Sequence, residues 1–139
     1  MIDNFSWILR VYYEDTDTGG VVFYANYLKF FERARTEWLR AAGISQQKLT
    51  ETHHVMFIVK STAVDYHAPA KLDNELKVSV VVERLGRASV HFVQQAWRIT
   101  ETGHELLAAG RIKVGCVDTA SFRPTAIPDD VLKIIKEAS

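Results

Sequence analysis

The chain has 139 residues, of which 47% are hydrophobic and 24% charged, as is typical of one globular domain with its own core. Seventeen basic residues balance seventeen acidic ones, so bulk charge does not favour binding to nucleic acid. Residues 1–15 lack the basic start and long apolar core of a signal peptide, and no apolar run reaches the roughly 20 residues of a membrane-spanning helix. We therefore expect a single cytoplasmic domain over residues 1–139, without stable membrane insertion.

The first third of the chain changes from a strand pattern to a helix pattern. Aromatic and β-branched residues predict a strand over Trp7–Tyr13. After an acidic turn, large residues recur at spacings of three and four over Tyr24–Ala42, which predicts a long helix that Gly43 ends. Large side chains cover much of this helix's circumference, so we expect a sheet to wrap around it.

The rest of the chain predicts four more strands and a short helix. Residues 44–52 are polar and indicate a connecting loop, whereas Pro128, with acidic residues after it, marks the start of a C-terminal helix. The predicted strands are Val55–Tyr66, Glu75–Arg84, Ser89–Ile99 and a last strand over about 106–116. The inner face of the last strand is expected to hold Leu106, Ala108, Gly110, Ile112, Val114 and Cys116. Short turns between the last three strands favour antiparallel pairing, so the predicted class is α+β.

Three carboxylates lie between the first strand and the long helix. Glu14, Asp15 and Asp17 come just before Gly19–Gly20. The helix opens a few residues later, so a carboxylate is close to a helix N-terminus, where unpaired N–H groups carry partial positive charge. The carboxylate could attack or activate water while the N–H groups stabilise an oxyanion. The structural alternative is that the acidic residues cap the helix and the glycines form a turn.

The remaining polar residues fit structural roles. A single cysteine, Cys116, excludes an intrachain disulfide and is expected to be buried in a strand. On the long helix, Arg33, Arg35 and Glu37 are expected to form ion pairs that stabilise the fold. No metal site is predicted, because metal-ligand spacing is absent from the five histidines, His53, His54, His67, His91 and His104.

The acidic turn and the segments around it resemble a known family. Tyr13–Val22, Ala25–Tyr27 and Phe31–Arg35 are similar to the first block of the hot-dog acyl-CoA thioesterases of the 4-hydroxybenzoyl-CoA thioesterase type. Three later segments resemble the second block of the YbgC-like branch, which is encoded with the Tol–Pal envelope system: Val64–Tyr66, Pro69–Ala70 and Leu72–Asp73. The resemblance implies a hot-dog fold, in which a five-stranded antiparallel sheet wraps around a long central helix. It also implies a homo-oligomer, either a dimer or a dimer of dimers (a homotetramer).

The resemblance assigns the catalytic roles to two residues. Asp17 is the second aspartate of the family's Asp-x-Asp pattern, and would act as nucleophile or as general base. Tyr24 aligns with the position whose backbone N–H polarises the substrate carbonyl. Many relatives in the branch have histidine there, so the tyrosine leaves the backbone role intact and puts a side-chain acid–base role in doubt. The structural alternative is that Tyr24 is an amphipathic interface aromatic. Asp15 is expected to be structural, bonding N–H groups of the turn.

Contacts to the phosphates of coenzyme A are expected from basic and hydroxyl side chains. The family places such contacts in the hairpin that here contains Arg87 and Ser89. Lys60 and Thr62 are further candidates, on the strand expected to border the acyl pocket.

We therefore expect an enzyme that hydrolyses acyl-CoA thioesters to a carboxylic acid and free coenzyme A. No separate cofactor is expected, because the coenzyme A moiety belongs to the substrate. Thioesters of an acyl carrier protein are a further candidate substrate, and nucleic acid is not an expected partner. Two alternatives stay open. One is a non-catalytic module that binds acyl thioesters or docks to a partner, and the other is a hot-dog hydratase or dehydratase, which usually needs a histidine base.

Overall fold

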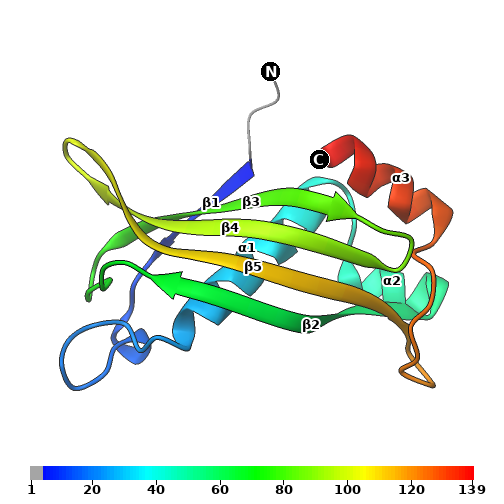
Figure 1. The fold of residues 1–139 in the computed structure, drawn as a ribbon, viewed down its shortest axis with the longest axis horizontal. Helices are drawn as coiled ribbons and strands as arrows, with labels where there is room; N and C mark the ends of the chain where they lie inside the picture. Colours follow the sequence, from blue (N-terminus) through cyan, green and yellow to red (C-terminus); the bar gives the residue numbers. More distant parts are fainter. Residues whose placement is uncertain (1–4) are drawn as a thin grey trace.

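A computed structural model describes residues 5–139 and shows one sheet wrapped along one long helix (Figure 1). The sheet has the strand order β1-β3-β4-β5-β2, and every neighbouring pair is antiparallel. The strands are β1 (Phe5–Arg10), β2 (Val55–Tyr66), β3 (Glu75–Leu85), β4 (Ser89–Thr100) and β5 (Gly103–Asp118). The helices are α1 (Asn26–Ala41), α2 (Gln46–His53) and α3 (Asp129–Ala138), with a 3-10 turn η1 (Tyr13–Asp15). The predicted α+β architecture, with a central helix and a short C-terminal helix, is confirmed.

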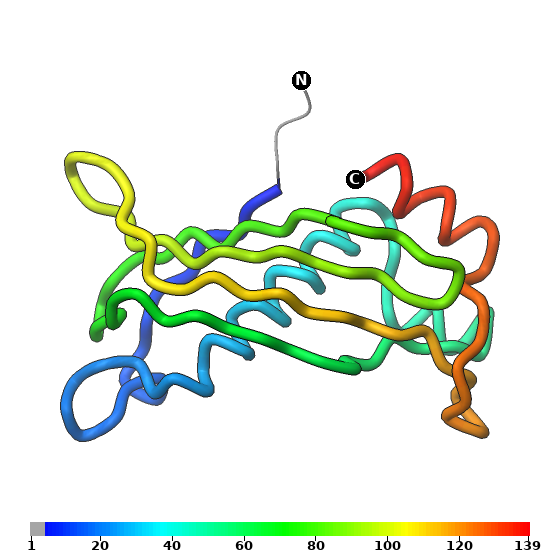
Figure 2. The backbone as a smooth tube through the Cα atoms, viewed as in Figure 1, coloured from blue at the N-terminus to red at the C-terminus, as the bar shows by residue number. Residues whose placement is uncertain are grey.

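The core lies between α1 and the inner face of the sheet. In β3, side chains alternate between the two faces, so that Leu76, Val78 and Val80 are buried against the helix. The helix buries a stripe of large residues against them, among them Phe30 and Phe31. The sheet runs obliquely across α1, and α3 covers one end of the molecule (Figure 2).

A glycine in β5 allows the sheet to approach α1 closely. A Cβ on Gly110 would stand 3.0 Å from the Phe31 ring and 3.3 Å from the Ile112 side chain. Few real Cβ atoms have a contact this short. The sheet can therefore pack this closely against α1 only because residue 110 has no side chain.

Several boundaries differ from the prediction. The first strand ends at Arg10, the helical turns of α1 begin at Asn26, and residues 46–53 form α2 rather than a loop. Ser45 caps α2, because its side chain accepts a hydrogen bond from the Lys48 N–H at 3.4 Å. Leu49 is the only buried residue of this helix, and a single apolar position gives no repeated helical spacing in the sequence.

The last strand contains a bulge that the alternating pattern did not predict. Ala96 pairs with Ala108, but Trp97 pairs with Leu106, which leaves Leu107 as the extra residue. Leu107 is fully buried, whereas Leu106 is only half-buried. The placement of Leu106 on the inner face was therefore wrong, because the bulge reverses the alternation at that point.

Candidate active site

The acidic turn is tied to the start of α1 through Asp15. This side chain is buried, and its Oδ2 accepts a hydrogen bond from the Tyr12 N–H at 2.8 Å. Its backbone carbonyl accepts two more, from the Phe23 N–H at 3.1 Å and from the Asn26 side-chain amide at 2.8 Å. Asp15 therefore has the structural role expected of it. Asn26, to which the sequence assigned no role, holds the turn against the helix.

Asp17 lies on the exposed part of the same turn. Its N–H donates to the Val21 carbonyl at 2.9 Å, and its Oδ1 accepts from the Gly19 N–H at 2.8 Å. A Cβ on Gly19 would stand 3.2 Å from this Oδ1, and Gly20 has a φ of +80°, which favours glycine. The two glycines therefore shape a tight turn that fixes one carboxylate oxygen. The other oxygen has no hydrogen-bond partner within the described part of the chain.

Tyr24 lies where the chain enters α1, and its backbone N–H is unpaired. Among residues 5–139, neither its N–H nor that of Ala25 has an acceptor. The Phe23 carbonyl accepts from the Asn26 N–H at 2.8 Å, which closes the turn that carries both groups. The two N–H groups lie at the positive end of the α1 dipole. This arrangement can stabilise negative charge on a bound carbonyl oxygen.

The remaining predicted site residues lie elsewhere on the chain. Arg87 and Ser89 belong to the β3–β4 turn, which lies beside α2 and α3, at the other end of α1 from the Asp17 turn (Figure 1). Lys60 and Thr62 are both exposed on β2, an edge strand of the sheet. Thr62 pairs with the inward-facing Ile112, whereas Lys60 lies over the other face. The single chain therefore brings Asp17 and Tyr24 together in one loop but does not add the four candidate phosphate contacts to it.

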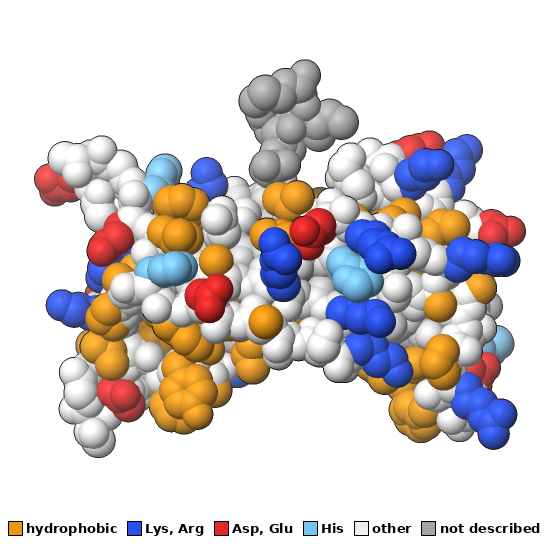
Figure 3. All heavy atoms as spheres, in the orientation of Figure 1, with side chains coloured by type: hydrophobic (Ala, Val, Ile, Leu, Met, Phe, Trp, Pro, Cys, Tyr) orange, Lys and Arg blue, Asp and Glu red, His pale blue; other side chains and the backbone are white. Residues whose placement is uncertain are grey.

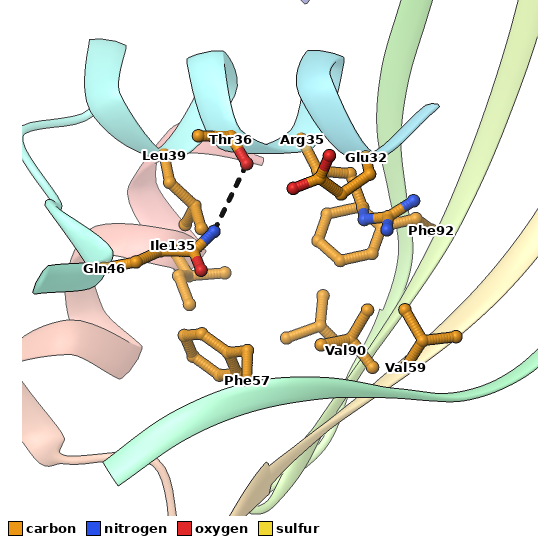
Figure 4. Close-up of a pocket in the computed structure, with 11 residues that line it drawn as sticks. Glu32, Arg35, Thr36, Leu39, Gln46, Phe57, Val59, Val90, Phe92 and Ile135 are labelled. Atoms are coloured by element: carbon orange, nitrogen blue, oxygen red, sulfur yellow. Dashed lines mark hydrogen bonds between the residues drawn. The ribbon is translucent and has the colours of Figure 1, made fainter. Parts of the chain in front are cut away.

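A cavity of about 110 Å³ lies between α1, α2, α3 and the sheet (Figure 4). Its walls are mostly apolar, formed by Leu39, Phe57, Val59, Val90, Phe92, Val114 and Ile135, with Glu32, Arg35, Thr36 and Gln46 as the polar residues. Its α1 residues run from Glu32 to Leu39, toward the C-terminal end of the helix and away from the Asp17 turn.

Arg35 is the buried charge of this cavity. Its Nη1 donates to the Gln94 side-chain oxygen at 2.8 Å, and its guanidinium carbon lies 6.0 Å from the centre of the Phe92 ring. Burial lowers the pKa of Arg35 to about 10, although the nearby Glu32 opposes this shift. The expected ion pairs are only partly found, because Glu37 pairs with Arg40 whereas Arg35 hydrogen-bonds to a neutral amide.

The sheet face that turns away from α1 carries a row of basic side chains. Arg84 pairs in register with His91 across β3 and β4, and His91 pairs with Lys113 of β5. Lys60 extends over Gly115, where a Cβ would stand 2.7 Å from the Lys60 Cε. Figure 3 views this face and shows basic and histidine side chains gathered near its middle, toward the α3 end. We call the side chains of Lys60, Arg84, His91 and Lys113 the basic row.

Residues 5–139 show neither a metal-ligand cluster nor a helix fit to span a membrane. No group of three His, Cys, Asp or Glu side chains there is arranged to hold a metal ion. None of the helices in this part of the chain has the length and apolar character required to cross a bilayer.

Known proteins share both the sequence and the fold of this chain. The chain is 47% identical over 132 residues to the acyl-CoA thioesterase YbgC of Haemophilus influenzae, covering 94% of each protein. It is 41% identical over 133 residues to the acyl-CoA thioester hydrolase YbgC of Escherichia coli, covering 96% of each. A solved structure from Pseudomonas aeruginosa superposes with a TM-score of 0.84 at 27% identity, covering 97% of this chain and 91% of that one. Residues 11–135 also match the family model of the thioesterase-like superfamily, so this chain belongs to that superfamily.

Proposed function

We propose that this protein hydrolyses acyl-CoA thioesters to a carboxylic acid and free coenzyme A. The observation that carries the proposal is the loop of residues 15–25. Among the described residues, this loop holds a carboxylate with one free oxygen and an unpaired N–H at a helix N-terminus. Relatives named as acyl-CoA thioesterases, at 41% and 47% identity, support the reaction and the substrate class.

In the proposed reaction, Asp17 attacks the thioester carbonyl or activates the water that attacks it. The Tyr24 N–H stabilises the oxyanion that forms. The carbon–sulfur bond then breaks, and coenzyme A leaves as a thiolate that takes up a proton. When Asp17 attacks directly, water hydrolyses the mixed anhydride in a second step. A thiolate leaves readily, so the proposed reaction uses no metal and no cofactor beyond the coenzyme A of the substrate.

We further propose that the working unit is a homo-oligomer, either a dimer or a homotetramer. Two observations support this. The edge strand β2 pairs only with β5, which leaves its other edge unpaired among the described strands. The Asp17 turn is flanked by exposed aromatic side chains, of Tyr12, Tyr13, Phe23 and Tyr24. Antiparallel pairing of two β2 edges would bring the Asp17 end of one chain beside the β3–β4 turn of its partner.

Such pairing would place Arg87 and Ser89 of one chain near the catalytic loop of the other. In this proposal they bind phosphates of coenzyme A, with Lys60 and Thr62 contributing from the shared edge. An acyl carrier protein is a second proposed source of thioester. The basic row supports it, because an acidic carrier would be attracted to that face.

The proposed compartment is the cytoplasm, where acyl-CoA is available. Association with the Tol–Pal envelope system rests only on the resemblance to the YbgC-like branch.

The test measures thiol release from acetyl- to palmitoyl-CoA and from benzoyl-CoA with a thiol reagent. Asp17→Asn and Asp17→Ala should lower kcat/KM by about 100-fold or more, the usual scale for loss of such a group. Asp129→Asn, an exposed aspartate on α3, serves as the matched control and should keep wild-type activity.

Other outcomes would point to the alternative functions. Saturable acyl-CoA binding without thiol release would favour a binding module. Conversion of enoyl-CoA with the thioester intact would favour a hydratase. Full activity in Asp17→Asn would refute the assigned role of Asp17.

A further inference from the structure

The last residue of β2 makes a hydrogen bond to the entrance of α1. The Tyr66 hydroxyl donates to the Tyr24 backbone carbonyl at 3.1 Å, although the two residues are 42 positions apart. The same carbonyl accepts from the Tyr27 N–H at 3.3 Å. An edge strand and the start of the central helix therefore meet at the residue whose N–H is proposed to polarise the substrate.

A small aromatic cluster fixes the Tyr66 ring in place. Its centre lies 5.4 Å from the Tyr27 ring and 6.1 Å from the Tyr24 ring, both in edge-on contact. Tyr27 is itself anchored, since it is buried and its hydroxyl accepts the Ala70 N–H at 3.0 Å. The Tyr66 hydroxyl is thus held by its neighbours in a fixed position relative to the turn.

The hydrogen bond acts on the peptide units that carry the unpaired N–H groups. The Tyr24 carbonyl shares a peptide unit with the Ala25 N–H, and the preceding unit carries the Tyr24 N–H. The Phe23 carbonyl of that preceding unit is already bonded to the Asn26 N–H at 2.8 Å. The Tyr66 hydroxyl therefore adds a second donor to the Tyr24 carbonyl, beside the Tyr27 N–H. This fixes the peptide unit that carries the Ala25 N–H, directly next to the unit that carries the Tyr24 N–H.

We propose that Tyr66 is a positioning residue for thioester hydrolysis: its hydroxyl holds the Tyr24 carbonyl and so helps to fix the turn from which the adjacent Tyr24 and Ala25 N–H groups face the developing oxyanion. This inference rests on the proposed function. Tyr66 acts through the backbone of Tyr24 and does not contact the reacting atoms itself.

The hydroxyl remains a donor over the working pH range. Burial raises the pKa of Tyr66, and the neighbouring Tyr24 raises it further. The phenol therefore stays protonated well above neutral pH. A positioning role then predicts that the effect of removing the hydroxyl is the same from pH 6 to pH 9.

The experiment compares Tyr66→Phe with Thr119→Val, measuring kcat, KM and the melting temperature. Tyr66→Phe removes only the hydroxyl and leaves the ring contacts, and the residue is 45% exposed, so the variant should fold. Thr119 also donates its hydroxyl to a backbone carbonyl, that of His54, at 3.1 Å, and it lies directly after β5, away from the Asp17 turn, which makes it the matched control. In Tyr66→Phe, kcat should fall about three- to tenfold, the scale of one neutral hydrogen bond, with KM unchanged and a melting transition that shows the variant is still folded.

The outcomes separate this inference from the proposed function. An unchanged kcat in Tyr66→Phe, a raised KM at constant kcat, or a wild-type to variant ratio that changes between pH 6 and pH 9 would overturn the positioning role. A fall in kcat matched by an equal fall in Thr119→Val would also overturn it. Absence of thiol release by the wild-type protein would instead refute the proposed function.

Discussion

The contact between Arg35 and Gln94 should contribute strongly to the stability of the cavity end of the molecule. Gln94 is fully buried in the middle of β4, where its side chain accepts from Arg35 at 2.8 Å. It also donates to the Phe31 carbonyl at 3.0 Å and to the Ser79 carbonyl at 3.3 Å. One amide therefore connects the central helix with two strands, and in Gln94→Leu all three hydrogen bonds are lost.

The size of the effect follows from these contacts. A hydrogen bond to a charged group contributes about 1.5–3 kcal/mol, and each neutral one about 0.5–1.5 kcal/mol. Gln94→Leu should therefore lower the free energy of unfolding by about 3 kcal/mol or more. Arg35→Met keeps much of the side-chain volume, and leaves the Gln94 oxygen without its donor. Each single variant loses the charge-assisted bond between Arg35 and Gln94, and the double variant loses the same bond only once. The loss of stability in the double variant should therefore be smaller than the sum of the two single losses, by a coupling free energy of about 1.5–3 kcal/mol.

Urea unfolding followed by tryptophan fluorescence would measure the cycle. Trp38 reports on this region, because it is only 4% exposed and its ring lies 5.5 Å from that of Phe92. Protomer concentration must be held constant, since assembly contributes to apparent stability. Arg33→Met, an exposed arginine on the same helix, supplies the control cycle and should be additive with Gln94→Leu. A coupling below about 0.5 kcal/mol between Arg35 and Gln94 would refute the reasoning, because distant sites add to within that margin.

Two further predictions concern β5 and the turn after it. Gly110→Ala should lower the free energy of unfolding by about 1–3 kcal/mol, because its Cβ meets the buried Phe31 ring. Gly115→Ala in the same strand should change the free energy of unfolding by no more than about 0.5 kcal/mol, because the new Cβ meets the flexible Lys60 side chain. Equal melting temperatures for Gly110→Ala and Gly115→Ala would contradict this difference. At Asp118, hydrogen bonds from the N–H groups of Ser121 and Ala120 lower the pKa of the carboxyl. The ionised carboxylate therefore stabilises the fold fully above the ordinary pKa of an aspartate, and this stabilisation is lost as the pH falls through the lowered pKa. The melting temperature of Asp118→Asn should therefore be furthest below that of the wild type near pH 7 and approach it near pH 3, and a difference constant with pH would contradict this.

The sequence predicted those features that depend on short-range patterns. The alternation of Leu76, Val78 and Val80 identified β3 and its buried face, and the helical spacing around Phe31 identified α1. These patterns repeat several times within one element, so a boundary error of a few residues does not hide them. A bulge such as that at Leu107 interrupts the alternation once and leaves no repeated signal.

The features that the sequence did not predict depend on partners far apart in the chain. Arg35 and Gln94 are separated by 59 positions, and the helical pattern indicated only local ion pairs for Arg35. Tyr66 reaches Tyr24 across 42 positions, and no spacing rule connects the end of a strand with a turn so distant. By contrast, the contact between Asp17 and Gly19 spans two positions, and the glycines that permit it are visible in the sequence.

The loop of residues 15–25 and the core are stabilised by different kinds of contact, so Asp17 can be substituted without disturbing the core. Backbone hydrogen bonds, the buried Asp15 and two glycines hold the loop. Within residues 5–139, the Asp17 side chain makes only its bond from the Gly19 N–H. An asparagine oxygen can accept that same bond, so Asp17→Asn should preserve the turn while removing the charge. Activity lost without loss of stability would therefore reflect the missing carboxylate itself, because no core contact depends on it.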